Sequence, residues 1–146
     1  MKFYDAPIKS EEIKRPTATV VSSPTVAYQV IPKKICNNYK EHFFVIYLNA
    51  RGEIVHKETV SVGTATQSLV HPREVFYPAI KRHAVAIIVV HNHPSGNVSP
   101  SQEDIATTER LLNAGKILGI PVEDHLIVSG SSYFSFKERG LLTSLS

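Results

Sequence analysis

Cysteine is scarce and long apolar runs are missing in this 146-residue sequence. The single cysteine, Cys36, excludes an intrachain disulfide framework and any zinc or redox site built from paired cysteines. No apolar segment approaches the roughly 20 residues that cross a bilayer, and the polar N-terminus lacks the apolar core of a signal peptide. We therefore expect a cytoplasmic protein without a membrane partner.

A strong excess of either charge is also missing. Lys and Arg number 16 against 13 Asp and Glu, and the basic residues are scattered along the sequence. The net charge of +3 therefore permits contact with nucleic acid but does not indicate it. The length suits one domain and is too short for a (β/α)₈ barrel, a fold in which His-x-His metal pairs also occur.

The periodicity of apolar residues predicts a single α/β (α+β) domain over residues 23–146, in which helices flank a mixed sheet. Residues 1–22 show no sustained period and are expected to form an extended arm. Helices are expected over residues 24–38, 72–83 and 101–118, and strands over 41–48, 53–62, 84–90, 125–128 and 133–136. The helical residues expected to face the core are Val75, Phe76, Ala79, Ile80, Ile105, Leu111, Leu112, Gly115 and Leu118.

Two histidines follow directly after the most apolar run, residues 84–90. If this run is a buried strand, side chains alternate across it, so His91 and His93 leave its end on the same face. Pro94 and Gly96 then prevent both a continuing strand and an early helix. The chain must turn directly after the two imidazoles.

Ser101 has the position of a helix N-cap, and Asp104 stands three residues later, where a carboxylate is favoured and can fold back over the first turn. This brings Asp104 towards the histidines, and two imidazoles with one carboxylate are typical of catalytic zinc with a fourth position left for water. Each residue also has a structural explanation, as a capping carboxylate or as a solvated histidine. Their combination around one shaped turn favours a metal site.

The sequence resembles the RadC family, whose catalytic-type domain has the JAMM (MPN-plus) metallopeptidase-like fold. The likeness covers roughly residues 23–140. It rests on His-Pro-Arg-Glu-Val at 71–75, on Asp-His-Leu-Ile-Val at 124–128, and on the signature from His91 to Asp104. This signature reads His-x-His, seven residues that begin with Pro, and then Ser-x-x-Asp. The resemblance implies a cytidine-deaminase-like, JAB-MPN architecture for residues 23–146.

The resemblance also assigns roles to residues. His91, His93 and Asp104 match the zinc ligands of the JAMM motif, and Ser101 matches the serine that helps to hold the tetrahedral intermediate. Zn²⁺ is therefore the expected cofactor.

The family uses an upstream glutamate as general acid and base, and Glu41, at the head of the first expected strand, resembles it. Glu74 is the rival for this role, although its place in the first turn of a helix gives it a structural reason as well. Of the remaining histidines, His125 is expected at most to contact a metal ligand from behind. The others are expected at the surface or at helix caps: His42, His56, His71 and His83.

These assignments predict a zinc metallopeptidase-like hydrolase that acts on a peptide or protein substrate. A DNA-repair-associated binding protein or a metal-dependent nuclease on the same scaffold is the alternative. Residues 1–22 do not resemble the helix-hairpin-helix region of long RadC proteins, which weakens the expectation of DNA binding. A nucleoside deaminase is excluded because its zinc site needs a Pro-Cys-x-x-Cys segment.

The substrate itself cannot be derived from these residues. Selectivity is expected to lie in the segments 61–70 and 96–99, which flank the site. The N-terminal arm and an exposed strand edge are features through which two copies could pair as a homodimer.

Overall fold

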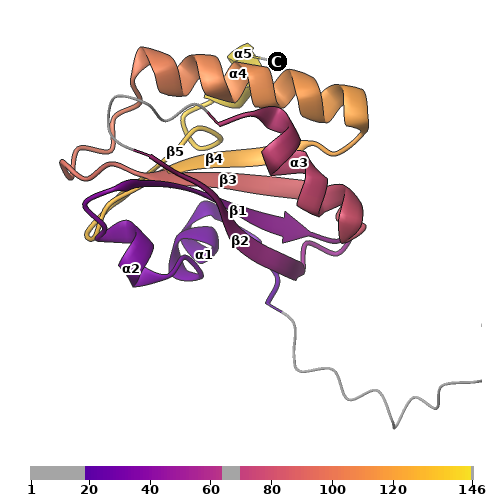
Figure 1. Ribbon diagram of the computed structural model, residues 1–146, viewed down its shortest axis with the longest axis horizontal. Helices are drawn as coiled ribbons and strands as arrows, with labels where there is room; N and C mark the ends of the chain where they lie inside the picture. The colour runs from indigo at the N-terminus through magenta and orange to yellow at the C-terminus, as the bar shows by residue number, and fades with distance from the viewer. Residues whose placement is uncertain (1–18, 64–69, 146) are drawn as a thin grey trace, which may run out of the picture.

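The structure, a computed structural model, describes residues 19–63 and 70–145 (Figure 1). Its helices are α1 (Pro24–Gln29), α2 (Lys33–Cys36), α3 (Pro72–Lys81), α4 (Gln102–Leu118) and α5 (Leu141–Leu145). Its strands are β1 (Glu41–Leu48), β2 (Ile54–Gly63), β3 (Ala86–Asn92), β4 (Val122–Val128) and β5 (Tyr133–Ser135). Residues 1–18 of the expected arm lie outside the described residues.

The described strands form one five-stranded sheet in the order β2-β1-β3-β4-β5. The central strand β3 is antiparallel to β1 and parallel to β4, and α4 forms the crossover between β3 and β4. Figure 1 shows α3 and α4 on one face of the sheet and α1 and α2 on the other. The predicted mixed sheet flanked by helices is thus confirmed, and β3 is buried along its whole length, as its apolar run predicts.

Side chains of β1 and β3 alternate between two apolar clusters. Phe43, Val45, Ile87 and Val89 belong to the cluster that also contains residues of α3 and α4. The even-numbered apolar residues of the same strands belong to the cluster beneath α1 and α2. Odd-numbered positions of β1 and β3 therefore face the layer of α3 and α4.

Several element limits differ from the prediction. β3 begins two residues later than expected and continues through His91 to Asn92, while β4 begins at Val122 instead of residue 125. α5 was not expected at all. The strand β2 extends to Gly63, so the first part of the expected selectivity segment 61–70 is strand, and residues 64–69 lie outside the described residues.

Two residues expected in the core are largely exposed. Ile80 is 56% exposed because it lies about 100° further around α3 than Ala79, beyond the arc that faces the sheet. Leu118 is 46% exposed in the last turn of α4. The core position expected for it is filled by Ile120, which follows the turn.

The end of α4 is packed very closely against the chain that follows it. Gly119 ends the helix in the left-handed conformation, with φ of 72°, and the N–H of Ile120 donates to the carbonyl of Gly115 at 2.9 Å. A Cβ atom at Gly115 would lie 2.5 Å from the Ile120 carbonyl oxygen. Only glycine allows this close approach.

Candidate metal centre

His91 lies inside the central strand of the sheet. It pairs with Phe43 of β1 on one side and with Ile127 of β4 on the other, and it is 6% exposed. Its odd position directs the ring towards the layer of α3 and α4, and the Phe43 ring stacks on it with 6.0 Å between ring centroids. The sheet therefore fixes the backbone of His91 from both sides, and Phe43 packs on its ring.

His93 follows the strand and is held by the turn that comes after it. Its N–H donates to the carbonyl of Val128 at 3.0 Å, and its own carbonyl accepts the N–H of Gly96, whose φ is 86°. The ring Nδ1 lies 2.7 Å from the carbonyl oxygen of Asn97. Because a carbonyl only accepts, Nδ1 carries a proton, so Nε2 holds the lone pair of the neutral ring and points away from the turn.

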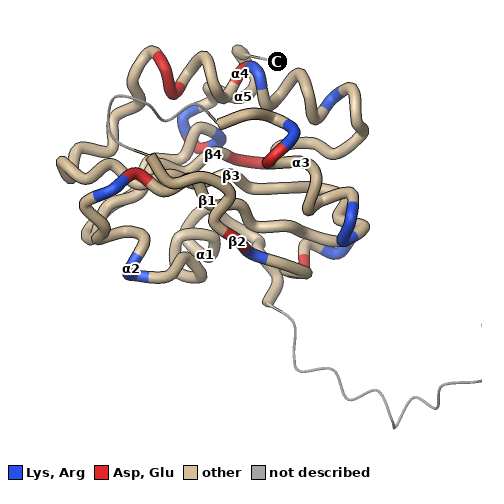
Figure 2. Tube along the Cα trace, viewed as in Figure 1, with Lys and Arg blue, Asp and Glu red and all other residues tan. Residues whose placement is uncertain are grey.

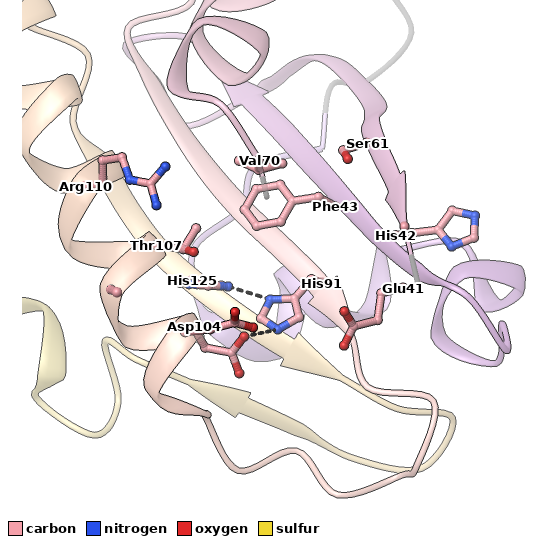
Figure 3. Close-up of a pocket in the computed structure, with 13 residues that line it drawn as sticks. Glu41, His42, Phe43, Ser61, Val70, His91, Asp104, Thr107, Arg110 and His125 are labelled. Atoms are coloured by element: carbon pink, nitrogen blue, oxygen red, sulfur yellow. Dashed lines mark hydrogen bonds and ion pairs between the residues drawn. The ribbon is translucent and has the colours of Figure 1, made fainter. Parts of the chain in front are cut away.

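Asp104 reaches the histidines from the first turn of α4. The predicted capping box is present: Ser101 Oγ accepts the Asp104 N–H at 3.1 Å, and Asp104 Oδ2 accepts the Ser101 N–H at 2.8 Å. The two carboxylate oxygens then lie 3.0 Å from His91 Nε2 and 3.1 Å from His93 Nε2. The structure thus brings together all three side chains that the sequence predicts as metal ligands, and Figure 3 shows two of them, His91 and Asp104.

The electrostatics of this cluster favour a carboxylate. Burial by itself raises the pKa of Asp104, but hydrogen bonds from His91 and His93 outweigh it and hold the pKa well below its usual range. The hydrogen bond to Asp104 raises the pKa of His93, and burial opposes this rise. Without a cation, a proton on His93 therefore helps to balance the negative charge of Asp104.

The cluster fits a small divalent ion. Zinc bonds of about 2.0–2.1 Å at tetrahedral angles place ligand atoms about 3.3 Å apart. The two Nε2 atoms here are 3.0 Å apart, and each is 3.0–3.1 Å from a carboxylate oxygen. Two imidazole nitrogens and a carboxylate oxygen are also a donor set that zinc accepts.

A pocket opens beside the cluster, lined by His91 and Asp104 together with Glu41, Phe43 and Arg110 among others (Figure 3). It gives a bound ion access to solvent and to a substrate. The converging ligands are therefore not sealed inside the protein, which is the arrangement of a catalytic rather than a structural zinc site.

Of the two candidate glutamates, only Glu41 reaches this pocket. It begins β1, and its odd position points it to the same side of the sheet as His91 (Figure 3). Glu74 is exposed in the first turn of α3 and does not line the pocket. The geometry therefore separates two residues that sequence reasoning left as rivals.

Sequence reasoning missed Asn92, which lies between the two histidines and is fully buried. Its Oδ1 accepts the N–H of His42 at 2.6 Å, and its Nδ2 donates to the carbonyls of Lys40 and Asn38 at 2.9 and 3.1 Å. These bonds hold the backbone on both sides of Glu41. A polar residue at a position that alternation places on a buried face was the signal that could have revealed it.

Ser101 and His125 lie near the cluster in different ways. Ser101 is exposed and caps α4, and its hydroxyl proton is not needed for the cap because the oxygen accepts there. His125 of β4 is completely buried, and its Nε2 lies 2.8 Å from His91 Nδ1. This contact agrees with the expectation that His125 touches a ligand from behind.

The remaining histidines lie away from the cluster. His71 caps α3 by accepting the N–H of Arg73, and His56 pairs with Glu58 at 2.7 Å. His83 is exposed. His42 lines the pocket but is not part of the cluster, and its Nδ1 lies 3.0 Å from the carbonyl oxygen of Lys40.

Within residues 19–63 and 70–145, no helix is both long enough and apolar enough to cross a membrane.

A mixed sheet between helices, with one histidine in its central strand, a second directly after that strand and an aspartate from the helix that follows, is typical of a JAB-type domain. Residues 21–141 match the family described as RadC-like JAB domain, and the chain belongs to this family. The resemblance stated from the sequence is thereby confirmed.

The chain is also similar to curated bacterial proteins named UPF0758. One from Rubrobacter xylanophilus is 49% identical over 129 residues, which cover 88% of this chain and 56% of that protein. Another from Symbiobacterium thermophilum is 50% identical over 121 residues, or 83% and 52% of the two chains. A third from Protochlamydia amoebophila is 47% identical over 116 residues, or 80% and 50%. The chain thus spans about half the length of these relatives, and their names state no activity.

Proposed function

We propose that this chain is a zinc-dependent hydrolase that cleaves peptide or isopeptide bonds, with Glu41 as general acid and base. One observation carries the proposal. His91, His93 and Asp104 converge within hydrogen-bonding distance of one another at the wall of a pocket that also contains Glu41. A zinc ion bound there would lower the pKa of a coordinated water to about 7 and polarise the carbonyl group to be attacked.

The proposal assigns proton transfer to Glu41. Its carboxylate lies outside the three converging ligand atoms but close to them: the pKa of His93 is raised first by Asp104 and, in smaller part, by the charge of Glu41. In the proposed reaction Glu41 accepts a proton from the attacking water and then delivers it to the leaving nitrogen. Such general acid–base catalysis contributes about 10²–10⁴-fold to a rate.

Ser101 is proposed to stabilise the negative charge that develops on the carbonyl oxygen. Its hydroxyl oxygen accepts the N–H of Asp104, so its hydroxyl proton remains available for donation. A well-placed donor of this kind stabilises a transition state by about 3 kcal/mol. The proposal thus gives Ser101 two functions, one in the cap of α4 and one at the reacting carbonyl.

The pocket walls support a peptide or protein substrate. Phe43 and Val70 give it an apolar part that suits a side chain, and Figure 3 shows Arg110 on α4 at the end away from Glu41, where it can bind a carbonyl or carboxylate oxygen. Figure 2 shows Lys and Arg interspersed with Asp and Glu along the described chain, without the continuous basic stripe that tracks a phosphate backbone. These features favour a peptide over DNA.

The test combines metal analysis with a substrate screen. Purified wild type, Glu41→Gln and Glu74→Gln are expected to contain one zinc ion per chain, and His93→Ala to contain little or none. In screens of peptide, isopeptide-linked and nucleic-acid libraries, we expect wild type and Glu74→Gln to cleave amide bonds and Glu41→Gln to lose about 10²–10⁴-fold in turnover. Zinc-loaded wild type that cleaves only nucleic acid, or that only binds it, would overturn the proposal in favour of a nuclease or a DNA-binding protein.

A further inference from the structure

A chain of buried hydrogen bonds leads from the backbone of α4 to the ring of His91. The hydroxyl of Thr108 donates to the carbonyl of Asp104 at 2.7 Å, and the same hydroxyl oxygen contacts His125 Nδ1. His125 Nε2 lies 2.8 Å from His91 Nδ1. On its other side, His91 Nε2 lies 3.0 Å from Asp104 Oδ1.

The direction of every bond in this chain follows from its first member. The carbonyl of Asp104 can only accept, so the single hydroxyl proton of Thr108 goes to it. The oxygen of Thr108 must then accept the Nδ1 proton of His125. His125 Nε2 is left with a lone pair, which accepts the Nδ1 proton of His91. When His91 is neutral, as a metal ligand must be, its Nε2 therefore carries the lone pair, and this is the nitrogen that faces Asp104 and His93.

Packing keeps the middle of the chain in place. Thr108 and His125 are both 0% exposed. The ring of His125 stacks on Phe136, with 4.7 Å between centroids and 8° between planes, and meets the edge of Phe43 at 6.0 Å. The ring thus has aromatic neighbours on two sides, and no water has access to replace a missing partner.

We propose that Thr108 and His125 are positioning residues for the metal, because they hold His91 in the tautomer that presents a lone pair to it. The proposal rests on the metal site proposed above, but not on the hydrolysis. The hydrogen-bond chain connects the helix and the strand that carry the site. It begins at the backbone carbonyl of Asp104 and ends at His91, whose Nε2 lies next to the Asp104 side chain. The spacing between α4 and β3 is therefore set by side chains behind the site.

The two histidine ligands differ in this respect. His93 is oriented by the backbone carbonyl of Asn97, which remains whatever residue stands there. His91 is oriented by side chains alone. Substitution of Thr108 or His125 should therefore change the orientation of the His91 ring and leave the His93 ring unchanged.

Zinc affinity tests the proposal without reference to any substrate. Competition with a chromophoric chelator should show that Thr108→Val, which keeps the shape but loses the hydroxyl, binds zinc about 10–100-fold more weakly than wild type. Thr108→Ser restores the hydroxyl and should bind within about threefold of wild type. The matched control is Thr107→Val, the same change one residue earlier in α4, and its zinc affinity should equal that of wild type.

A second measurement needs no variant. Nitrogen-15 spectra of the imidazole rings in metal-free wild type at pH 8 should show His91 and His125 protonated at Nδ1. A His91 ring without a proton at Nδ1, or equal zinc affinities of folded Thr108→Val and Thr107→Val, would overturn the proposal. Absence of zinc binding in wild type would overturn it together with the metal site, whereas loss of hydrolysis with zinc retained would contradict only the proposed function.

Discussion

The side chain of Asn92 accepts the backbone N–H of His42 at 2.6 Å, from the face of β3 opposite to the metal ligands. With its second bond, to the carbonyl of Lys40, it fixes the chain immediately before and after Glu41. The three consecutive residues at 91–93 therefore have different tasks. In the proposed site the two histidines are metal ligands, and the asparagine between them holds the segment that carries the proposed base.

Replacing Asn92 by Ala should leave zinc binding intact and lower turnover at least tenfold, because the segment around Glu41 loses its anchor. The unpaired backbone groups should also lower the free energy of unfolding by about 1–3 kcal/mol. Zinc content, turnover and urea unfolding measure these effects. Asn49→Ala is the matched control, since the Asn49 side chain also bonds backbone N–H groups, but in the turn at the far end of β1. Wild-type turnover in Asn92→Ala would show that Asn92 does not position Glu41.

Ser101 permits a test that separates capping from catalysis. Ser101→Ala removes the cap of α4, which should lower the free energy of unfolding by about 1 kcal/mol, and should also reduce turnover about 10²–10³-fold. Ser23→Ala removes the corresponding cap of α1, where Ser23 Oγ accepts the Val26 N–H, and should cost similar stability with no loss of turnover. Equal turnover in the two variants would show that Ser101 acts only as a cap.

Removal of zinc should lower the melting temperature. A ligand that binds only the folded state at 100 times its Kd stabilises that state by about 2.7 kcal/mol. We therefore expect the melting temperature of wild type to fall by several degrees on chelation and to recover when zinc is restored. His93→Ala, which lacks a ligand, should melt at the same temperature with and without zinc. A zinc-dependent shift in this variant would place the metal elsewhere.

The metal-free protein should lose stability as the pH rises above about 6.5, the ordinary pKa of histidine. The hydrogen bond to Asp104 raises the pKa of His93, so its contribution is complete below 6.5 and disappears as the pH passes the raised pKa. Burial lowers the pKa of His125, so this residue destabilises the fold only when the pH drops below about 6.5. It does not contribute to the loss expected above pH 6.5. Zinc affinity should change in the opposite direction, because the ligands must lose their protons.

Urea unfolding of chelator-treated protein between pH 6 and 9 measures this slope. His93→Gln should flatten it, and His83→Asn, a change at an exposed histidine with a left-handed backbone, should not. A slope that His93→Gln leaves unchanged would assign the effect to another group.

The convergence of His91, His93 and Asp104 could be predicted because short-range rules determine it. Alternation along a strand, a turn imposed by Pro94 and Gly96, and a capping box are all properties of neighbouring residues, and together they bring Asp104 back to the histidines. The limits of β3 were less accessible, since pairing with β1 and β4 continues the strand through His91 to Asn92. The apolar run alone ends at residue 90.

Residues that act across the sheet could not be found in this way. The contacts of Asn92 with the start of β1, and of Thr108 with His125, depend on strand register and on where α4 crosses the sheet. Glu41 was named through the family resemblance, and its distance from the site follows from the pairing of Phe43 with His91. The errors at Ile80 and Leu118 have a similar origin, because helical periodicity locates a stripe without fixing which residues at its border touch the core.

Gly115 helps to determine the position of the Asp104 carboxylate, although the two residues are not in contact. It anchors one end of α4 against the Ile120 carbonyl, while Asp104 stands about 16 Å away along the same rigid rod. A methyl group added at residue 115 would tilt α4, and this tilt would displace Asp104, near the other end of the helix, further than residue 115 itself. A substitution at residue 115 would therefore change the affinity of the proposed site for its metal ion without touching any ligand.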